Sequence, residues 1–408
     1  MKSKLISALT VSALLAAQIV FNARQVWAQS GFEVKDVRVA TRFGQEIVFE
    51  ARLESSIPIM QATLLFREAR EEITRVETLE LGPDGSASFT YDASQKVFPP
   101  FSKIIFWYQA TLEDGTTHTS GLFNVVYKDD RFTWRDATSG PVNVHWYDGD
   151  DAFAQAALDA AGKGLLGINE IVPLTLNAPI DVYIYSTVED LQGALTLGGE
   201  EWVGGHANPE LGMVMVAIAP GALQSIEMET EIPHELAHVM LYRSLGSGYK
   251  NLPAWLSEGL ASMVEQYPNA DYAQALSIAS KNNSLLSFDD LCASFPPDSG
   301  RAFLAYAQSQ SFVRYLRDSY GITGLTTLIQ TYAGGLDCET GARRALSASL
   351  NQLEARWREA ALGQNAAGVA LRNLSPYMLV MILVLLVPLW GAIDMIRERR
   401  KRERSAGK

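Results

Sequence analysis

The distribution of hydrophobic and polar positions divides the chain into regions of different character. The first region, residues 29–130, contains short β-branched and aromatic runs separated by turn signals such as Pro83-Asp84-Gly85 and Glu113-Asp114-Gly115. Seven such runs predict strands, at residues 34–40, 46–53, 62–67, 74–81, 86–91, 103–112 and 121–127. This spacing predicts an all-β domain built as an immunoglobulin-like sandwich, which acts either as a spacer or as a binding module.

The pattern changes at about residue 131, where helical runs begin to alternate with strands. The alternating elements are predicted at residues 142–146 (strand), 150–168 (helix), 180–185 (strand), 187–197 (helix) and 212–218 (strand). From about residue 221 onward the chain is almost entirely helical in character. A small sheet followed by a helical lobe predicts an α+β domain over residues 131–365.

The N-terminus has the pattern of an export signal. Lys2 and Lys4 precede an apolar run at residues 5–21, and Val26-Trp27-Ala28 supplies a small-residue cleavage pattern. Because the apolar run is short for a bilayer span, we interpret residues 1–28 as a cleaved signal peptide. The alternative is an uncleaved N-terminal anchor.

The C-terminus has the pattern of a membrane anchor. No charged residue occurs between Arg372 and Asp394, an interval long enough to cross a hydrocarbon core. We therefore predict one transmembrane helix at residues 374–396, which makes the lipid bilayer a partner of the chain. The basic segment at 397–408 then marks the cytoplasmic side. Together the two ends predict a single-pass cell-membrane protein whose domains lie on the extracytoplasmic side.

The charge and the cysteines add two constraints. The formal net charge is −12, and because both termini are basic, the segment between them is more acidic still. Such a surface argues against nucleic acid or anionic lipid as the main partner. The chain has two cysteines, Cys292 and Cys338, and a disulfide between them is expected outside the cytoplasm. The alternative is a pair of buried thiols.

The helical lobe begins with an H-E-x-x-H pattern, His234-Glu235-Leu236-Ala237-His238. Residues i and i+4 of a helix lie one turn apart on the same face, so these two imidazoles can bind one metal ion. Glu235 is rotated off that face and reaches a water at the metal's open position. The pattern predicts a zinc site with His234 and His238 as ligands and Glu235 as the general base. Thr230 is predicted to cap this helix, with Pro233 in its first turn and Gly246 at its end.

A hydrolytic zinc ion takes three protein ligands and one water, so the histidines leave the site one ligand short. The next predicted helix carries Glu258, which lies off the apolar stripe of that helix. Glu258 is therefore the predicted third ligand, and Glu265, two turns further along, is the alternative. Gly259 is expected to allow close packing against a neighbouring helix.

These residues resemble a known family. H-E-L-A-H followed by W-L-S-E-G-L-A-S at residues 255–262 resembles the gluzincin zinc metallopeptidases, the group that contains thermolysin. The second block is similar to the W-L-N-E-G-F-A-S block of aminopeptidase N-type enzymes, and residues 142–362 resemble the peptidase MA-like domain family. The resemblance implies a zincin-type metallopeptidase domain with Zn²⁺ as cofactor and a peptide or protein as substrate. It also implies the same roles for His234, His238, Glu258 and Glu235.

The resemblance also implies a role for Tyr306, and it leaves the type of peptidase undecided. Aminopeptidase N-type enzymes have a Y-x-K-G segment whose tyrosine stabilises the oxyanion, and Tyr306 matches it in type and chain order, although Gln308 and Ser309 replace the Lys and Gly. No G-A-M-E-N-like segment is present, so endopeptidase and exopeptidase activity both remain open. Residues 212–216 are either an edge strand that binds extended substrate or an interior strand.

Two functions of different classes follow. The first is a membrane-anchored extracytoplasmic zinc metallopeptidase, in which Glu235 takes a proton from a zinc-bound water and Tyr306 helps to hold the oxyanion. The second is a non-catalytic envelope binding or scaffold protein with a structural or vestigial zinc site. A structural site normally closes with a fourth protein ligand, whereas a catalytic site keeps a water. The general base Glu235 favours the enzyme.

Overall fold

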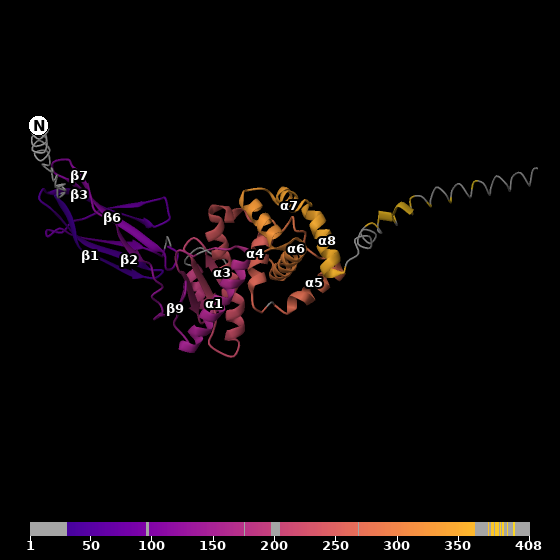
Figure 1. Ribbon diagram of the computed structural model, residues 1–408. Helices are drawn as coiled ribbons and strands as arrows, with labels where there is room; N and C mark the ends of the chain where they lie inside the picture. The colour runs from indigo at the N-terminus through magenta and orange to yellow at the C-terminus, as the bar shows by residue number, and fades with distance from the viewer. Residues whose placement is uncertain are drawn as a thin grey trace, which may run out of the picture. The chain divides into compact units, whose positions relative to one another are not determined.

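The computed structural model describes residues 31–363 except 95–97, 175, 197–204 and 268, together with scattered positions between 374 and 395. The chain divides into two compact units, Met1–Asp130 and Arg131–Lys408, and each is described by itself. Figure 1 shows strands alone in the described part of the first unit and both strands and helices in the second.

The described part of the N-terminal unit contains two antiparallel sheets. The first has the order β1-β2-β5, and the second has the order β4-β3-β6-β7, with β8 also paired to β6. The strands are β1 (Phe32–Arg42), β2 (Glu46–Ser55), β3 (Ile59–Glu68), β4 (Arg75–Leu79), β5 (Ser86–Asp92), β6 (Lys103–Leu112), β7 (Thr117–Thr119) and β8 (Phe123–Val126). The prediction of an all-β N-terminal domain is confirmed. Seven strands are predicted and the described residues of this unit form eight, because β7 makes a short additional pair with β6.

The core of this unit lies between the two sheets. Alternate residues of β2, β3 and β6 are buried, as the two-residue period of a strand requires. The ring of Phe49 on β2 lies 5.1 Å from that of Phe66 on β3 and 5.2 Å from that of Phe106 on β6. These cross-sheet contacts between buried aromatic residues show that the sheets pack face to face.

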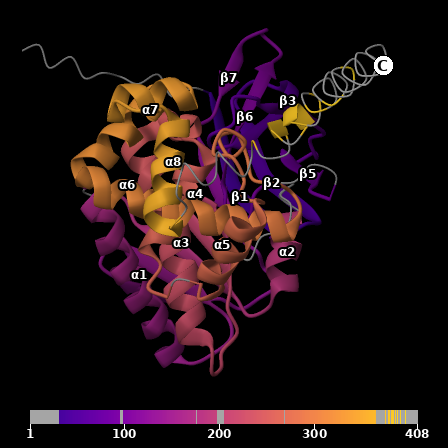
Figure 2. The ribbon, with the colours of Figure 1, turned by 90° about the vertical axis from the view of Figure 1, so that its right-hand side faces the viewer.

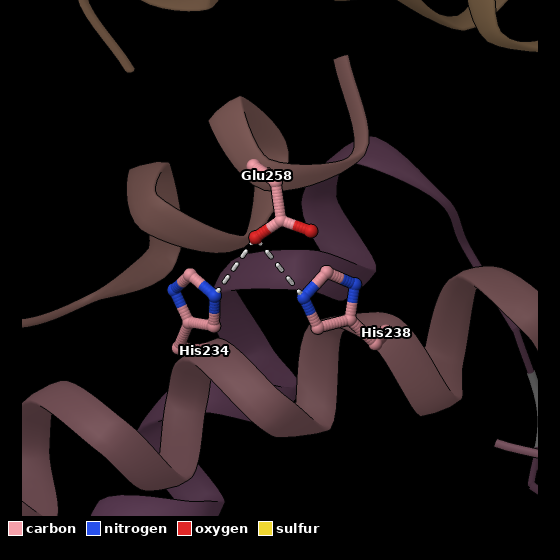
Figure 3. A group of neighbouring side chains, drawn as sticks. All are labelled: His234, His238 and Glu258. Carbon is pink, nitrogen blue, oxygen red and sulfur yellow. Dashed lines mark ion pairs between the residues drawn. The ribbon is translucent and has the colours of Figure 1, made fainter. Parts of the chain in front are cut away.

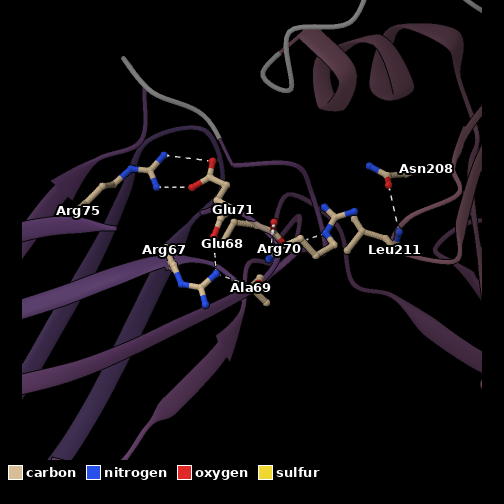
Figure 4. Close-up of polar contacts among 8 residues, drawn as sticks. All are labelled: Arg67, Glu68, Ala69, Arg70, Glu71, Arg75, Asn208 and Leu211. Carbon is tan, nitrogen blue, oxygen red and sulfur yellow. Dashed lines mark hydrogen bonds and ion pairs between the residues drawn. The ribbon is translucent and has the colours of Figure 1, made fainter. Parts of the chain in front are cut away.

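Several side chains support the connection from β3 to β4 (Figure 4). Arg67 donates to the carbonyl oxygens of Ala69, at 3.0 Å, and Glu71. The carboxylate of Glu68, only 3% exposed as a residue, accepts from the backbone N–H of Arg70 at 3.0 Å and from its guanidinium at 3.1 Å. Arg75 closes the connection through an ion pair with Glu71 at 2.5 Å.

The second unit contains a five-stranded sheet with the order β12-β13-β11-β10-β9. The strands are β9 (Arg135–Ser139), β10 (Val142–Trp146), β11 (Ile180–Tyr185), β12 (Gly205–Asn208) and β13 (Met213–Ala217). The three central strands are parallel, and β9 and β12 pair antiparallel at the two ends of the order. Two helices occur between strands, α1 (Asp151–Ile171) and α2 (Val188–Thr196).

A helical lobe follows the sheet, as the sequence predicts. Its elements are α3 (Gln224–Leu245), the 3₁₀ helix η1 (Gly246–Asn251), α4 (Ala254–Val264), α5 (Asp271–Asn282), α6 (Ser299–Ala333), α7 (Cys338–Leu346) and α8 (Leu350–Leu362). Helices α1 and α3 lie side by side (Figure 1), and α4 to α8 gather into the lobe (Figure 2). Apolar residues of the sheet, of α1 and of the lobe form one continuous core.

The predicted cysteine pair lies at disulfide distance, with the Cα atoms of Cys292 and Cys338 6.3 Å apart. This pair joins the segment after α5 to the first residue of α7. In the part of the chain that the structure describes, no helix is long and apolar enough to cross a membrane. The predicted signal peptide at 1–28, the basic tail at 397–408 and most of the predicted span at 374–396 lie outside the described residues.

Candidate metal centre

Helix α3 begins earlier than the sequence analysis expects. Its first residue is Gln224, so Pro233 lies inside the helix and Thr230 does not cap it, and that prediction is wrong. A proline inside a helix normally leaves the carbonyl four residues earlier without a partner. Here that carbonyl belongs to Glu229, and it accepts a hydrogen bond from the backbone N–H of Gln266 at 2.9 Å. A tertiary contact therefore satisfies the group that the proline frees.

The far end of α3 agrees with prediction. Gly246 follows the last helical residue with φ of 56°, a left-handed conformation that favours glycine. Along the helix between these ends, His234 and His238 are one turn apart and their rings lie 5.2 Å from each other. His238 and Glu235 are buried, and His234 is largely so. The residues of the H-E-x-x-H motif therefore lie on a regular turn of α3.

Helix α4 brings Glu258 over this turn (Figure 3). The Oε2 atom of Glu258 lies 3.4 Å from Nε2 of His234 and 3.6 Å from Nε2 of His238. All three potential ligand atoms lie within 4.8 Å of one another. A tetrahedral zinc ion with bonds of about 2 Å separates its ligands by about 3.3 Å. Two nitrogens and one carboxylate oxygen at these separations fit a zinc ion.

The position of α4 is set by its neighbours. Its first two N–H groups, from Ala254 and Trp255, donate to the carbonyl oxygens of Cys292 and Leu291 at 3.0 and 3.1 Å. On the other side, Gly259 packs against α6, as predicted, where an added Cβ would lie 2.5 Å from a side-chain atom. These contacts set the position of α4 and therefore the position of the Glu258 carboxylate relative to the two histidines.

The electrostatics of the site favour a cation. Burial alone would raise the pKa of the Glu258 carboxyl, but the two histidines outweigh it and hold that pKa well below its usual range. Burial likewise opposes a charge on His234, but hydrogen bonds to Glu258 and Glu265 hold its pKa well above its usual value. The carboxylates therefore stabilise positive charge at this point, as a metal site requires.

The outer nitrogens of the two histidines have different partners. Nδ1 of His234 lies 2.8 Å from Oε1 of Glu265, a residue that is 9% exposed. Glu265, proposed from the sequence as an alternative ligand, therefore lies on the far side of the ring and orients it. Nδ1 of His238 instead lies 3.0 Å from the hydroxyl of Tyr249 and 3.3 Å from that of Ser257. Burial raises the pKa of Tyr249 to about 12, so its hydroxyl is protonated at neutral pH.

Glu235 lies against strand β12. A Cβ added to Gly205 would lie 2.7 Å from Oε1 of Glu235, which shows how closely the backbone approaches this carboxylate. Strand β13, which contains most of the segment considered as an edge strand, is interior, and β12 is the terminal strand of the order. The turn between them is closed by the backbone N–H of Leu211, which donates to Oδ1 of Asn208 at 3.2 Å (Figure 4).

Tyr306 lies beside the same site. It projects from α6, and its ring lies 6.3 Å from that of His234 and 4.9 Å from that of Phe295. Burial, followed by the charges of Glu258 and Glu235, raises the pKa of Tyr306 well above its usual value. The phenol therefore keeps its proton and can donate it in a hydrogen bond.

Sequence reasoning found the three convergent side chains but missed several of their supports. Tyr249 lies in a short 3₁₀ helix that has no periodic pattern, and Gly205 lies seven residues before the strand predicted at 212–218. His206 follows Gly205 on the same strand, β12. The Gly-Gly dipeptide at 204–205 is a signal of close backbone approach that could have directed attention to this segment.

Comparison with known proteins identifies the class to which this fold and site belong. A family model described as the peptidase MA superfamily matches residues 160–363, half of the 408-residue chain. The chain belongs to the peptidase MA superfamily. The matched range includes His234, Glu235, His238 and Glu258, and with this membership the resemblance seen in the sequence is confirmed.

Solved structures share only limited similarity with the chain. A chain titled "Myokine structure" is 12% identical with a TM-score of 0.19, covering 23% of this chain and 95% of that one. Wild-type OgpA from Akkermansia muciniphila is 15% identical with a TM-score of 0.20, covering 24% and 27%. A carbohydrate-binding module family 56 β-1,3-glucan binding domain is 10% identical with a TM-score of 0.17, covering 23% and 96%. Comparison with curated proteins gives no match.

Proposed function

We propose that this protein is a zinc-dependent metallopeptidase that hydrolyses peptide bonds. The observation that carries the proposal is the convergence of His234, His238 and Glu258 around one point, with the carboxylate of Glu235 on the same helix turn. Two neutral imidazoles and one carboxylate form a ligand set used by hydrolytic zinc enzymes. Membership of the peptidase MA superfamily supports the same reaction class.

Each residue has a distinct part in this chemistry. When bound by the three ligands, a zinc ion supplies a Lewis acid that polarises the scissile carbonyl and acidifies water. Glu235 accepts the proton of the attacking water and then delivers it to the leaving amine. Tyr306 donates its phenolic hydrogen to the carbonyl oxygen as that oxygen gains negative charge. Glu265 orients His234 through its Nδ1 atom.

The substrate would bind as an extended strand. Strand β12 pairs with β13 on one side and with no other described strand. A peptide that added to the remaining edge of β12 would use backbone hydrogen bonds for most of its affinity. Gly205, on this strand, lies against Glu235, so the added peptide would pass close to the general base.

The scaffold alternative requires a different site. A structural zinc ion is normally closed by four protein ligands. In the described parts of the chain, the group around His234 contains three. A measurement of zinc coordination by X-ray absorption separates the two functions, because a fourth side chain would support the scaffold and a water would support the peptidase.

The deciding experiment is Glu235→Gln in the full-length protein, assayed with a peptide library. We expect the variant to retain one zinc ion per chain and to lose hydrolysis, because the amide cannot accept the proton. His238→Ala is the matched comparison and should lose both zinc and activity. Wild-type turnover by Glu235→Gln, or turnover that survives removal of zinc by a chelator, would refute the proposal.

We also propose that the protein is exported and anchored by its C-terminal segment. The support is the sequence pattern alone: the basic and apolar N-terminus, the uncharged interval between Arg372 and Asp394, and the basic tail beyond it. Protease treatment of intact cells should digest residues 29–372 and spare a C-terminal tag. Protection of the whole chain from added protease would contradict this topology.

A further inference from the structure

We propose that Tyr249 is a positioning residue for the metal centre. In this arrangement Nδ1–H of His238 donates to the Tyr249 hydroxyl, which selects the tautomer whose Nε2 lone pair faces the metal. The Nδ1 to hydroxyl distance is 3.0 Å, and Nε2 of the same ring lies 3.6 Å from the Glu258 carboxylate. The inference rests on the proposed function, because it assigns a role within the same site.

The element that carries Tyr249 is attached at both ends. Gly246, with φ of 56°, turns the chain out of α3 and into η1. Beyond the tyrosine, the side-chain amide of Asn251 donates to the carbonyl oxygen of Ala333 at 3.1 Å, which connects η1 to the end of α6. The backbone at Gly248 also approaches α6 closely, since an added Cβ would lie 2.8 Å from the oxygen of Ala333. The hydroxyl therefore occupies a defined position relative to His238.

Ring packing holds the side chain of Tyr249 as well. Tyr242, one turn after His238 on α3, meets the ring of Tyr249 edge to face at 6.0 Å. The ring of His238 itself lies 6.4 Å from that of Tyr249 at a steep angle. With the ring fixed in this way, little conformational entropy remains to be lost when its hydroxyl bonds to the imidazole.

The other contacts of His238 do not replace this bond. Ser257 is the second partner of Nδ1, and its hydroxyl lies farther away, at 3.3 Å. Nδ1 of His234 has a carboxylate partner, Glu265, whereas the partners of Nδ1 of His238 are the neutral hydroxyls of Tyr249 and Ser257. A neutral partner orients the imidazole without placing another negative charge in a site that already holds Glu235 and Glu258. Loss of the phenolic oxygen would leave the ring free to rotate toward Ser257.

The test compares Tyr249→Phe with Tyr242→Phe in the full-length protein, since each removes one hydroxyl from a neighbouring ring. Zinc affinity is measured by competition with a chromophoric chelator. We expect Tyr249→Phe to weaken zinc binding about 10- to 100-fold, the usual effect of removing such a partner, and Tyr242→Phe to bind as the wild type does. The absorption bands of the cobalt-substituted protein should shift for Tyr249→Phe alone.

A rescue variant distinguishes positioning from packing. Adding Ser257→Asn to Tyr249→Phe places a longer side chain with a carbonyl acceptor beside Nδ1 and should restore part of the zinc affinity. If Tyr249→Phe does not fold, Asn251→Ala serves instead, because it keeps the hydroxyl but releases η1 from α6. Asn251→Ala should also weaken zinc binding, by a smaller factor.

Three outcomes would overturn the inference. They are wild-type zinc affinity in Tyr249→Phe, an equal loss in Tyr242→Phe, or wild-type affinity in Asn251→Ala when the first variant cannot be folded. If the wild-type protein binds zinc and hydrolyses peptides while Tyr249→Phe is unchanged, the role of Tyr249 fails and the proposed function stands. If the wild-type protein binds no zinc, both fail together.

Discussion

The close approach of β12 to Glu235, the proposed general base, offers a sharp test of the site through Gly205→Ala. Gly205 has no positive φ, so alanine adopts its backbone conformation without strain. The added Cβ would lie 2.7 Å from Oε1 of Glu235 and 3.1 Å from its Cγ and Cδ atoms. Favourable contact begins at about 3.5 Å, so the carboxylate has to move by about 1 Å.

A displacement of this size has a large effect on catalysis and a small effect on stability. Misplacing a reacting group by about 1 Å can cost about 100-fold in rate, which corresponds to about 2.7 kcal/mol of activation free energy. We expect kcat for a peptide substrate to fall by about this factor, with one zinc ion retained per chain. The free energy of unfolding should change by less than about 1 kcal/mol, because alanine also restricts the unfolded chain.

The matched control is Gly221→Ala, where an added Cβ meets no atom within 4 Å. This variant should keep the wild-type kcat and zinc content. If Gly205→Ala has the wild-type kcat, Glu235 does not act from the position next to β12, and the reasoning is refuted. Loss of zinc from Gly205→Ala would also contradict it, since the three atoms nearest to the added methyl group all belong to Glu235 and not to a proposed ligand.

Three further predictions concern packing, the oxyanion and pH. Gly259→Ala should lower the free energy of unfolding by about 1–3 kcal/mol in urea titrations, because its Cβ would lie 2.5 Å from a side-chain atom of α6. Tyr306→Phe should lower kcat by about 100- to 1,000-fold with little change in KM, as expected for an oxyanion donor. Burial opposes charging of His145, but hydrogen bonds to Asp181 and Asp136 outweigh it and raise its pKa above the usual value. The stabilisation from the charged form of His145 is therefore fully present below about pH 6.5 and is lost as pH rises through the raised pKa. The free energy of unfolding should consequently fall more steeply with rising pH in the wild type than in His145→Gln.

Each of these predictions has its own contradicting outcome. Unchanged stability of Gly259→Ala would show that α4 and α6 are farther apart than described. A change in KM alone for Tyr306→Phe would indicate substrate binding rather than oxyanion stabilisation. Parallel pH profiles for the wild type and His145→Gln would show that the contacts of His145 at 2.5 Å to Asp136 and 3.1 Å to Asp181 do not stabilise its charged form.

Most of the element order and the three convergent side chains could be predicted from sequence, because each depends on local geometry. The spacing of His234 and His238 places them on one helical face in any regular helix. Gly246 ends that helix because glycine adopts positive φ without steric cost. The order of strands and helices also follows from hydrophobic patterns within each element. For the same reason Glu258 could be proposed as the third side chain of the group.

The errors arose where a distant residue decides the local structure. Pro233 predicts a helix start, but the carbonyl that it frees is satisfied by the backbone of Gln266, so α3 continues through it. The sequence leaves residues 212–216 open as either an edge strand or an interior strand, because sheet order depends on which strands pair, and in the fold β12 is the terminal strand. Glu265, the alternative to Glu258 as third ligand, is placed by the fold behind His234.

By itself, then, the sequence determined which side chains form the candidate site: two imidazoles one turn apart, the carboxylate of Glu235 between them and the carboxylate of Glu258 on a following helix. Only the tertiary structure decided how these side chains are oriented. It brought Glu265 and Tyr249 to the outer nitrogens of the two histidines, and it set β12 against Glu235. The physical reason is that ligand identity depends on short-range helical spacing, whereas orientation depends on contacts between residues far apart in the chain.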